Sequence, residues 1–413
     1  MAKKSDAPAT LIKRCTTPLL LASVIFSGCK TGGSSGSSTN LASTNEGITV
    51  AVLLASHGDI DDTKGELEDY IKTAFKHNVG IPLPYWARPA VTQPAYMLSV
   101  KNVKSQYDII GPTHYRENSQ KQIEALALAL KEAGISARTY YGFNFAKPYI
   151  SETMAQMQKD GIKKIIVYNQ GAQCSWASQG ENIGDVREYM KEHPEYDAEV
   201  IGYRQYSEDQ RFRDLMVDVV TRDAKEKFPG VSASQVCILV GSHGLPKIMT
   251  DAGDPAIAEM RRAFDYMVTK MKPYRLYHGF LNDDFIPGAV WAQPPSDDVA
   301  TTMRDDGCRN ILLDGRLSFT VNHRATLYDL NYAARNILET KDDKINWQAN
   351  LTWKKPKVEL ANHFDGDPGL AKLIATLTKE ALARNGDLEV IKELGQPVTP
   401  APKKEDSCKR IAP

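Results

Sequence analysis

The chain alternates short apolar runs with longer stretches of helical periodicity. The runs have the length and the Val, Ile, Leu and Tyr content of buried strands. They lie at 48–56, 136–143, 163–170, 197–203, 235–242, 274–280 and 309–315. Between them are segments such as 116–134, where apolar residues recur at three- and four-residue steps up to a glycine. This alternation predicts an α/β fold with parallel sheets covered by helices on both faces.

Two of the apolar runs end on the same tripeptide, Ser-His-Gly, which places His57 and His243 just after predicted strands. Open α/β sheets bind ligands at the carboxyl ends of their strands. The repeat therefore predicts two Rossmann-like halves facing one cleft, each contributing an imidazole. We expect these domains at 47–205 and 206–345, followed by a helical extension at 346–395 and a disordered, Pro- and Lys-rich tail at 396–413.

The first residues do not follow this pattern. A basic leader and a short apolar run at 18–26 precede Cys29. The run is too short to span a bilayer as a helix and is typical of a secretory signal peptide, here 1–29. The Phe-Ser-Gly-Cys sequence resembles the lipobox of bacterial lipoproteins. That resemblance implies lipidation of Cys29 and anchoring in the cell envelope, on the periplasmic side of the outer membrane; an ordinary signal peptide is the alternative. The Gly/Ser-rich stretch 30–46 predicts a flexible tether.

Composition and missing motifs narrow the function further. The 51 Lys and Arg residues balance the 51 Asp and Glu residues, so no overall field favours nucleic acid as a partner. The chain has no phosphate-binding glycine motif, nucleophile elbow or His-Glu-x-x-His, so no nucleotide cofactor or hydrolase chemistry is predicted. No Cys-x-x-Cys pair occurs, and spacing does not identify disulfide partners; Cys237 and Cys308 are expected to be buried. The oligomeric state is not indicated.

The second histidine turn belongs to a longer motif. Ser-His-Gly-Leu-Pro at 242–246 precedes Gly-Asp-Pro at 253–255. Together they resemble the signature of ferrochelatase, the enzyme that inserts Fe²⁺ into a porphyrin. Further segments resemble other parts of that family's pattern, in the same order, at 109–122, 168–180, 291–313 and 319–330. The ordered set, spanning 48–334, resembles class II tetrapyrrole chelatases and implies two chelatase-type domains around a tetrapyrrole cleft.

The histidine set departs from ferrochelatase. Where that family reads Asp-His-x-Glu-Thr, the segment 322–326 reads Asn-His-Arg-Ala-Thr. The family's glutamate, a proton acceptor or metal-relay group, is thus replaced by Ala325. A histidine at the position of His57 resembles the anaerobic sirohydrochlorin cobaltochelatases, in which a histidine near the position of His323 is also a metal ligand. The resemblance therefore implies Fe²⁺ or Co²⁺ as the divalent metal substrate.

Imidazole suits this chemistry, because neutral imidazole binds these metals and titrates near neutral pH. Metal insertion requires presenting a partly desolvated ion and removing two pyrrole protons. We expect His243 to bind metal and accept a proton, His323 to be a second ligand or proton acceptor, and His57 to approach the metal from the other half. Glu117, Asp59 or His323 is expected to compensate for the missing glutamate.

Two further segments are expected to contact the tetrapyrrole. His114, Tyr115 and Arg116 precede a predicted helix, and arginine pairs well with carboxylates. An ordinary loop histidine is the alternative for His114. The Pro-rich stretch 81–90 holds Tyr85 and Trp86, and its position resembles the lip of the porphyrin cleft. A rigid surface loop is the alternative there.

Two functions from different classes follow. The intact motif around His243 favours a ferrochelatase-like lyase that inserts metal into a porphyrin-type macrocycle. Ala325 favours a non-catalytic envelope lipoprotein that binds haem or another tetrapyrrole. A divalent-metal carrier that uses the same histidines is a third interpretation.

Overall fold

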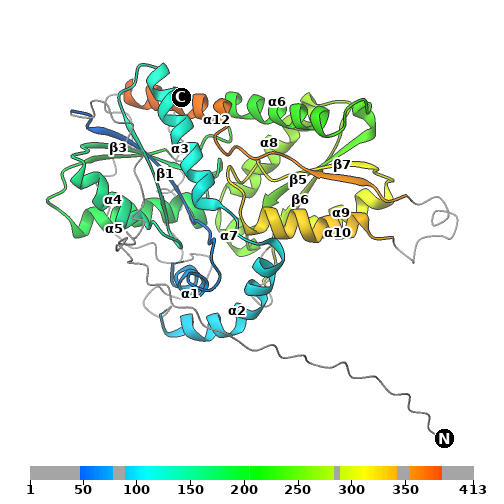
Figure 1. Cartoon of the computed structure of the whole chain (residues 1–413), viewed down its shortest axis with the longest axis horizontal. Helices are drawn as coiled ribbons and strands as arrows, with labels where there is room; N and C mark the ends of the chain where they lie inside the picture. Colours follow the sequence, from blue (N-terminus) through cyan, green and yellow to red (C-terminus); the bar gives the residue numbers. More distant parts are fainter. Residues whose placement is uncertain (1–46, 78–88, 204, 283–288, 342–353, 384–413) are drawn as a thin grey trace, which may run out of the picture. The chain divides into compact units, whose positions relative to one another are not determined.

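The computed structural model describes residues 47–77, 89–203, 205–282, 289–341 and 354–383. Within them, eight strands form two four-stranded sheets in which every neighbouring pair is parallel. The first sheet has the order β2-β1-β3-β4 and the second β6-β5-β7-β8 (Figure 1). The strands are β1 (Val50–Ser56), β2 (Arg138–Phe143), β3 (Lys164–Asn169), β4 (Glu199–Tyr203), β5 (Val236–His243), β6 (Arg275–Leu281), β7 (Asn310–Asp314) and β8 (Lys357–Leu360). The predicted α/β fold with two parallel sheets is confirmed.

Helices connect the strands and cover the sheets. They are α1 (Leu67–His77), α2 (Pro89–Ile110), α3 (Tyr115–Glu132), α4 (Ile150–Lys159), α5 (Glu181–Glu192), α6 (Gln210–Lys227), α7 (Lys247–Ala252), α8 (Ala256–Lys270), α9 (Ser296–Asp305), α10 (Arg335–Glu339) and α12 (Pro368–Ala383). Two π-helical segments, Trp176–Gly180 and Ala325–Ala334, precede α5 and α10. Among the described helices none is both long and apolar enough to cross a membrane.

The two sheets share one hydrophobic core and each has a second core on its other face. Along β1, Val52 and Leu54 face the shared core, whereas Ala51, Leu53 and Ala55 pack in the outer one with α4 and α5. This alternation follows from the two-residue period of a strand, and it explains why the strands read as continuous apolar runs. Burial on both faces therefore fixes the register of each sheet.

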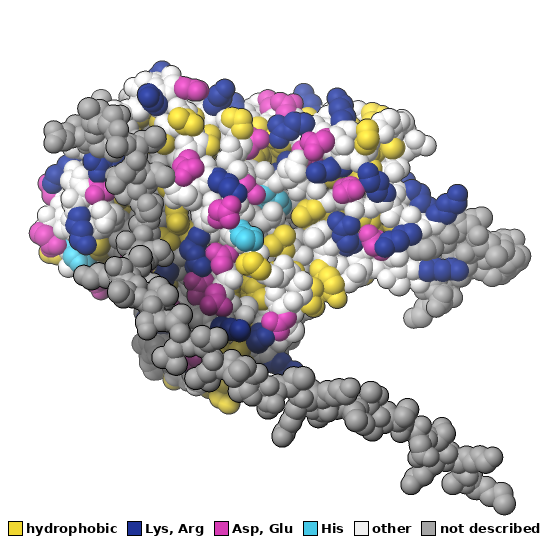
Figure 2. Space-filling model, viewed as in Figure 1, with side chains coloured by type: hydrophobic (Ala, Val, Ile, Leu, Met, Phe, Trp, Pro, Cys, Tyr) yellow, Lys and Arg dark blue, Asp and Glu magenta, His cyan; other side chains and the backbone are white. Residues whose placement is uncertain are grey.

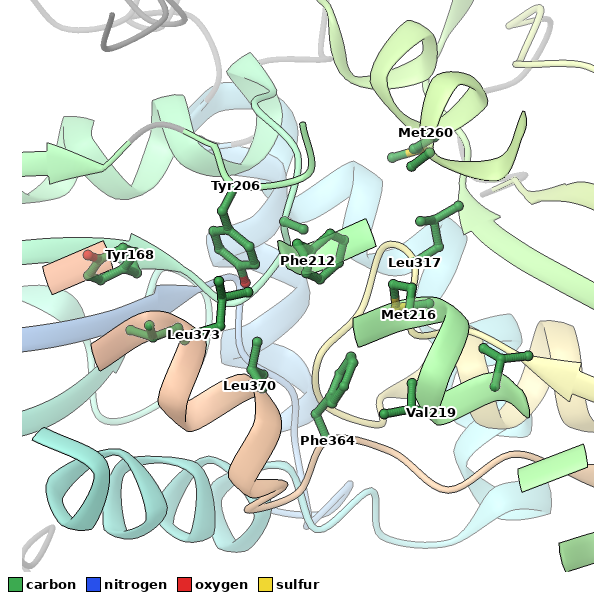
Figure 3. Close-up of a cluster of buried hydrophobic side chains, with 14 of the residues drawn as sticks. Tyr168, Tyr206, Phe212, Met216, Val219, Met260, Leu317, Phe364, Leu370 and Leu373 are labelled. Atoms are coloured by element: carbon green, nitrogen blue, oxygen red, sulfur yellow. The ribbon is translucent and has the colours of Figure 1, made fainter. Parts of the chain in front are cut away.

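Residues from both halves meet in the shared core (Figure 3). Its labelled members include Tyr168 of β3, Phe212 and Met216 of α6, and Met260 of α8. Helix α12 packs against both α3 and α6 and adds leucines to the same cluster. Each buried aliphatic or aromatic side chain contributes on the order of 1.5–3 kcal/mol, so the shared core ties the two halves together.

The segment predicted as a helical extension contains a strand as well as a helix. Strand β8 pairs with β7 and completes the second sheet before α12 begins. Its sequence, Lys-Val-Glu-Leu, has only one fully buried side chain, that of Val358. A four-residue edge strand with alternating polar residues carries too little apolar signal to be recognised from sequence.

A disulfide joins Cys237, at the start of β5, to Cys308, just before β7. Both residues are buried, as expected, and they bridge strands that are neighbours in the second sheet. The bond closes a loop across a sequence separation of 71 residues. Restricting the unfolded chain in this way stabilises the folded state.

Replacing both cysteines of this pair by alanine is expected to lower the free energy of unfolding by about 2–5 kcal/mol. Denaturant unfolding of the wild type, Cys237→Ala, Cys308→Ala and the double variant measures it. Because either single substitution already breaks the bond, the losses should not add. Additive losses would contradict the pairing.

Candidate active site

A large cavity lies at the carboxyl ends of the central strands of both sheets. Its volume is about 1190 Å³, and its wall includes residues that follow β1, β3, β5 and β7, together with α1 and α2. Ligand pockets for drug-sized molecules reach about 1,000 Å³, so this cavity has room for a large, flat organic ligand. In Figure 2, basic and acidic side chains are interspersed over the described part of the face shown, without a broad region of one sign.

The glycines of both Ser-His-Gly turns are required by close packing. At Gly58, φ is +78°, and an added Cβ would lie 2.6 Å from the Phe143 side chain. At Gly244, an added Cβ would lie 1.8 Å from Asn282 Oδ1. Gly58 is therefore required by its backbone conformation, whereas a side chain at Gly244 would displace Asn282. Both turns leave the preceding histidine in the cavity wall.

His243 is the last residue of β5 and lines the cavity. Its backbone N–H donates to Ser318 Oγ at 3.1 Å. Its ring Nδ1 donates to the carbonyl oxygen of Gly244, because a carbonyl can only accept. This hydrogen bond sets the tautomer and leaves the lone pair on Nε2. His243 therefore carries an unprotonated Nε2, the form of imidazole that can bind a metal.

His323 also lines the cavity, with its Nδ1 accepting the backbone N–H of Ala325 at 2.9 Å. Burial, followed by the neighbouring His243, holds the pKa of His323 well below its ordinary value, so the ring is neutral. With Nδ1 as an acceptor, the proton of the neutral ring lies on Nε2. The Phe319 ring stands perpendicular to His323 at 4.0 Å and also contacts His243. In this arrangement His323 is a hydrogen-bond donor, and acting as ligand or acceptor through Nε2 requires transfer of that proton.

His57 lies in the wall contributed by the first half. Its Nε2 is 3.2 Å from Oε2 of Glu181, the first residue of α5, and its ring stacks on Phe145 at 4.6 Å. The Glu181 carboxylate is buried, so the imidazole of His57 has an acidic neighbour inside the wall. Sequence analysis did not identify Glu181, because it is distant in sequence and carries no motif.

Asp59 connects the first histidine turn to the segment around His323. Its Oδ1 accepts from Ile60 N at 2.8 Å and from the Tyr107 hydroxyl, and its Oδ2 accepts the backbone N–H of Arg324 at 2.8 Å. Burial raises the pKa of Asp59 to about 6, and the hydrogen bonds partly offset this. Ala325, at the position of the family's glutamate, is buried in the same wall. Through its hydrogen bond to the backbone of Arg324, Asp59 is thus the cavity carboxyl group that fixes the chain just before Ala325.

The structure brings only one of the three residues predicted at 114–116 into the cavity. Tyr115 lines it and donates from its hydroxyl to Ser56 Oγ at 3.1 Å. His114 is exposed and lies 3.5 Å from Glu117, which is itself exposed. Arg116 pairs with Asp61 and Glu66. His114, Arg116 and Glu117 all lie outside the cavity wall.

Several predicted residues fall outside the described part of the chain. They are Cys29, Tyr85 and Trp86. Within the described residues, no group of three or more His, Cys, Asp or Glu side chains is arranged to hold a metal ion. The three predicted histidines all line the one cavity.

Two buried carboxylates from the second half hold a loop of the first half in the cavity wall. Asp254, of the Gly-Asp-Pro motif, accepts from Ser175 Oγ and Trp176 N, each at 2.8 Å. Glu259 accepts from Ser207 Oγ at 2.7 Å and Cys174 N at 3.1 Å. The aspartate of the motif is thus a link between the two halves.

Glu259 is expected to make stability depend on pH. Burial raises its pKa to about 7, so the folded state holds a proton that the unfolded chain releases near pH 4.5. The contribution of Glu259 to the free energy of unfolding is therefore complete below pH 4.5 and is lost as the pH rises through 7. The stability of the wild type relative to Glu259→Gln should fall by about 2–3 kcal/mol between pH 4.5 and 7.5. Denaturant unfolding across this range measures it, with the exposed Glu226→Gln as a control; a constant difference would contradict the prediction.

Two parallel α/β halves that direct imidazoles from strand ends into one shared cavity define the chelatase-type class of proteins. Residues 49–347 match the family model described as Ferrochelatase, so the chain belongs to the ferrochelatase family. Family membership supports metal chelation with a tetrapyrrole as substrate.

Relatives from distant organisms share this family. The chain is 24% identical over 268 residues to a ferrochelatase of Rippkaea orientalis, covering 63% of this chain and 67% of that protein. It is 25% identical over 300 residues to the chloroplastic ferrochelatase-2 of Hordeum vulgare, covering 70% and 60%. It is 22% identical over 336 residues to the mitochondrial ferrochelatase of Homo sapiens, covering 78% and 74%. SirB from Bacillus subtilis with Fe³⁺ aligns at 13% identity and a TM-score of 0.43, covering 82% of this chain and 97% of that one.

Proposed function

We propose that this protein is a metal chelatase that inserts Fe²⁺ or Co²⁺ into a porphyrin-type macrocycle. The metal replaces two pyrrole protons, so each turnover releases two protons. The observation that carries the proposal is the hydrogen bond from His243 Nδ1 to the Gly244 carbonyl. It leaves the lone pair of the ring on Nε2, and His243 lines a cavity formed by both halves. An imidazole near neutral pH is an effective acceptor for the pyrrole protons and a ligand for either metal.

The other two histidines complete the proposed mechanism from different sides of the cavity. His57, which lies beside the Glu181 carboxylate, approaches the macrocycle from the first half and is the proposed ligand that delivers the metal. His323 donates from Nε2 in its resting tautomer, and this donor is suited to a pyrrole nitrogen that has lost its proton. Asp59 is the cavity carboxyl group closest in role to the family's missing glutamate.

The charges of the cavity favour a macrocycle with few acidic groups. Among its described lining residues, Arg324 is the only Lys or Arg, whereas Asp59, Asp297 and Asp329 also line it. A carboxylate-rich macrocycle such as sirohydrochlorin would meet more repulsion than attraction here. We therefore place a porphyrin ahead of sirohydrochlorin as the substrate.

Anaerobic visible spectroscopy of the full chain with porphyrin or sirohydrochlorin, and Fe²⁺ or Co²⁺, tests the function. Repeated turnover with one pair supports a chelatase and identifies the metal and macrocycle. A stoichiometric spectral shift without turnover contradicts it and supports the second candidate, a tetrapyrrole-binding lipoprotein, which Ala325 favours because the family's proton acceptor is missing.

We also propose that the protein is exported and anchored in the cell envelope through Cys29, with 1–29 as the signal peptide and 30–46 as the tether. The Cys237–Cys308 disulfide supports an oxidising compartment, because such bonds are rare in the cytosol. Metabolic labelling with an alkyne fatty acid tests this. Label on the wild type that disappears in Cys29→Ala supports the anchor, and an unlabelled wild type contradicts it.

A further inference from the structure

We propose that His278, a residue of β6 outside the cavity wall, positions His243 through the hydroxyl group of Ser242. This inference rests on the proposed function, because that function makes His243 the proton acceptor and metal ligand. Neither His278 nor Ser242 is among the described residues that line the cavity, so neither touches the macrocycle or the metal. The role of the pair is to hold the end of β5, from which His243 enters the cavity wall.

The contact between His278 and Ser242 crosses from β6 to the last residues of β5. His278 Nε2 lies 2.9 Å from Ser242 Oγ. Ser242 is fully buried and directly precedes His243. A hydroxyl group can both donate and accept, so either tautomer of a neutral imidazole satisfies it. Burying a hydroxyl without a partner is unfavourable, so His278 makes a serine tolerable at this position.

The imidazole of His278 is itself held in place. Its ring stacks on Phe264 of α8 at 4.8 Å and lies 4.7 Å from the ring of Phe280, which lines the cavity. Burial, followed by the positive charge of Arg261, lowers the pKa of His278 to about 4, so the ring is neutral near neutral pH. A phenylalanine could make the same ring contacts but could not bond to the serine. The hydroxyl group, and not the packing, therefore requires a histidine here.

The pairing of β5 with β6 continues into the turn that sets the tautomer of His243. The two strands are parallel, with His243 opposite Leu281. Gly244 N then donates to the Leu281 carbonyl at 2.8 Å. The carbonyl of the same glycine accepts the proton on Nδ1 of His243. A shift of β6 against the end of β5 would therefore move the carbonyl on which that tautomer depends, and the contact made by His278 opposes such a shift.

Rates of metal insertion by the full chain separate positioning from packing. His278→Phe keeps the ring contacts and removes the hydrogen bond. We expect kcat to fall about 10- to 100-fold, with KM for the macrocycle changed by less than about twofold. Ser242→Ala should lower kcat to a similar extent. His278→Gln, whose amide can bond to the serine, should restore most of kcat.

The double variant, with Ser242→Ala and His278→Phe together, distinguishes the two roles. Its single partners leave either a buried hydroxyl or a buried imidazole without its partner, whereas the double variant leaves neither. Its denaturant midpoint should therefore return towards that of the wild type. We expect its kcat to stay low, because the hydrogen bond that positions the end of β5 is still missing.

The tautomer of His243 provides a readout that needs no metal insertion. Ring ¹H–¹⁵N spectra of the full chain with labelled histidines should show a proton on Nδ1 and none on Nε2 of His243, with His243→Asn to assign the signals. His278→Phe should give a mixture of both tautomers. His193→Phe is the matched control and should change neither the tautomer nor kcat. His193 also stacks on an aromatic ring and bonds through Nδ1, but it lies outside the cavity wall.

Three results would overturn the proposal. The first is a kcat that recovers together with stability in the double variant, because activity would then follow packing alone. The second is an unchanged His243 tautomer in His278→Phe, and the third is an equal loss of kcat in His193→Phe. If the wild type inserts no metal while the tautomer of His243 still depends on His278, the proposed function fails and the positioning role stands.

Discussion

Replacing His243 by asparagine is expected to lower the rate of metal insertion about 10²- to 10⁴-fold, the range for removing a positioned acid–base group. The Asn amide can still donate to the Gly244 carbonyl, as Nδ1 of the histidine does. The basic Nε2, which takes the pyrrole proton and binds the metal in our proposal, has no counterpart in asparagine. Initial rates from anaerobic visible spectra, at saturating metal and macrocycle, measure the effect on kcat.

A matched histidine separates this effect from general damage. His114 is exposed, lies outside the cavity wall and has φ +55°, a conformation that asparagine tolerates. His114→Asn should change the rate by less than about twofold, and both variants should unfold within about 1 kcal/mol of the wild type. A rate for His243→Asn within tenfold of the wild type would exclude His243 as the proton acceptor.

The central strands β1, β3, β5 and β7 could be predicted because they are continuous apolar runs buried along most of their length. The seven predicted runs correspond to β1 to β7, although the edge strands β2, β4 and β6 keep partly exposed residues. Strand β8 lies at the edge, and its pairing with β7 depends on tertiary contacts that no local pattern records. The two halves could be predicted from the repeated Ser-His-Gly turn, and their shared core could not.

The histidines of the site could be located from sequence, but their proton positions could not. His243 and His323 are similar in sequence terms, yet a carbonyl faces Nδ1 of one and a backbone N–H faces Nδ1 of the other. Their tautomers are therefore opposite, and only backbone geometry determines this. The contact between Asp59 and Arg324 spans 265 positions, so it too depends on the folded chain.

His114 and Arg116 lie outside the cavity wall although Tyr115 between them lines it, because neighbouring residues at the start of a helix point in different directions. Successive side chains on a helix are about 100° apart. Since Tyr115 faces the cavity at the start of α3, the residues on either side of it face away. The residue types at 114–116 indicated a segment near the cavity. Which of its side chains lines the cavity depends on the direction in which each residue points at the start of α3.

Replacing Arg316 by methionine is expected to cost about 3–5 kcal/mol of unfolding free energy, because it leaves two buried carboxylates without their cation. Arg316 is 1% exposed and donates from Nε to Asp314 Oδ2 at 2.9 Å. Its Nη1 lies 2.9 Å from Asp223 Oδ2, and both aspartates are fully buried. The residue also begins the loop whose Ser318 and Phe319 line the cavity, so the same change should lower metal insertion.

This cost should itself depend on pH. Burial raises the pKa of Asp223 and Arg316 lowers it, so without the guanidinium the pKa of this carboxyl rises further in the folded state. Stability contributed by groups with raised pKa values is lost as the pH rises. Arg316→Met should therefore differ from the wild type more at pH 8 than at pH 5, when both are unfolded with denaturant. The exposed Arg309→Met should stay within about 0.5 kcal/mol of the wild type. A loss below about 1 kcal/mol at pH 8 would contradict the prediction and would mean that the cluster stabilises the fold no more than ordinary hydrogen bonds do.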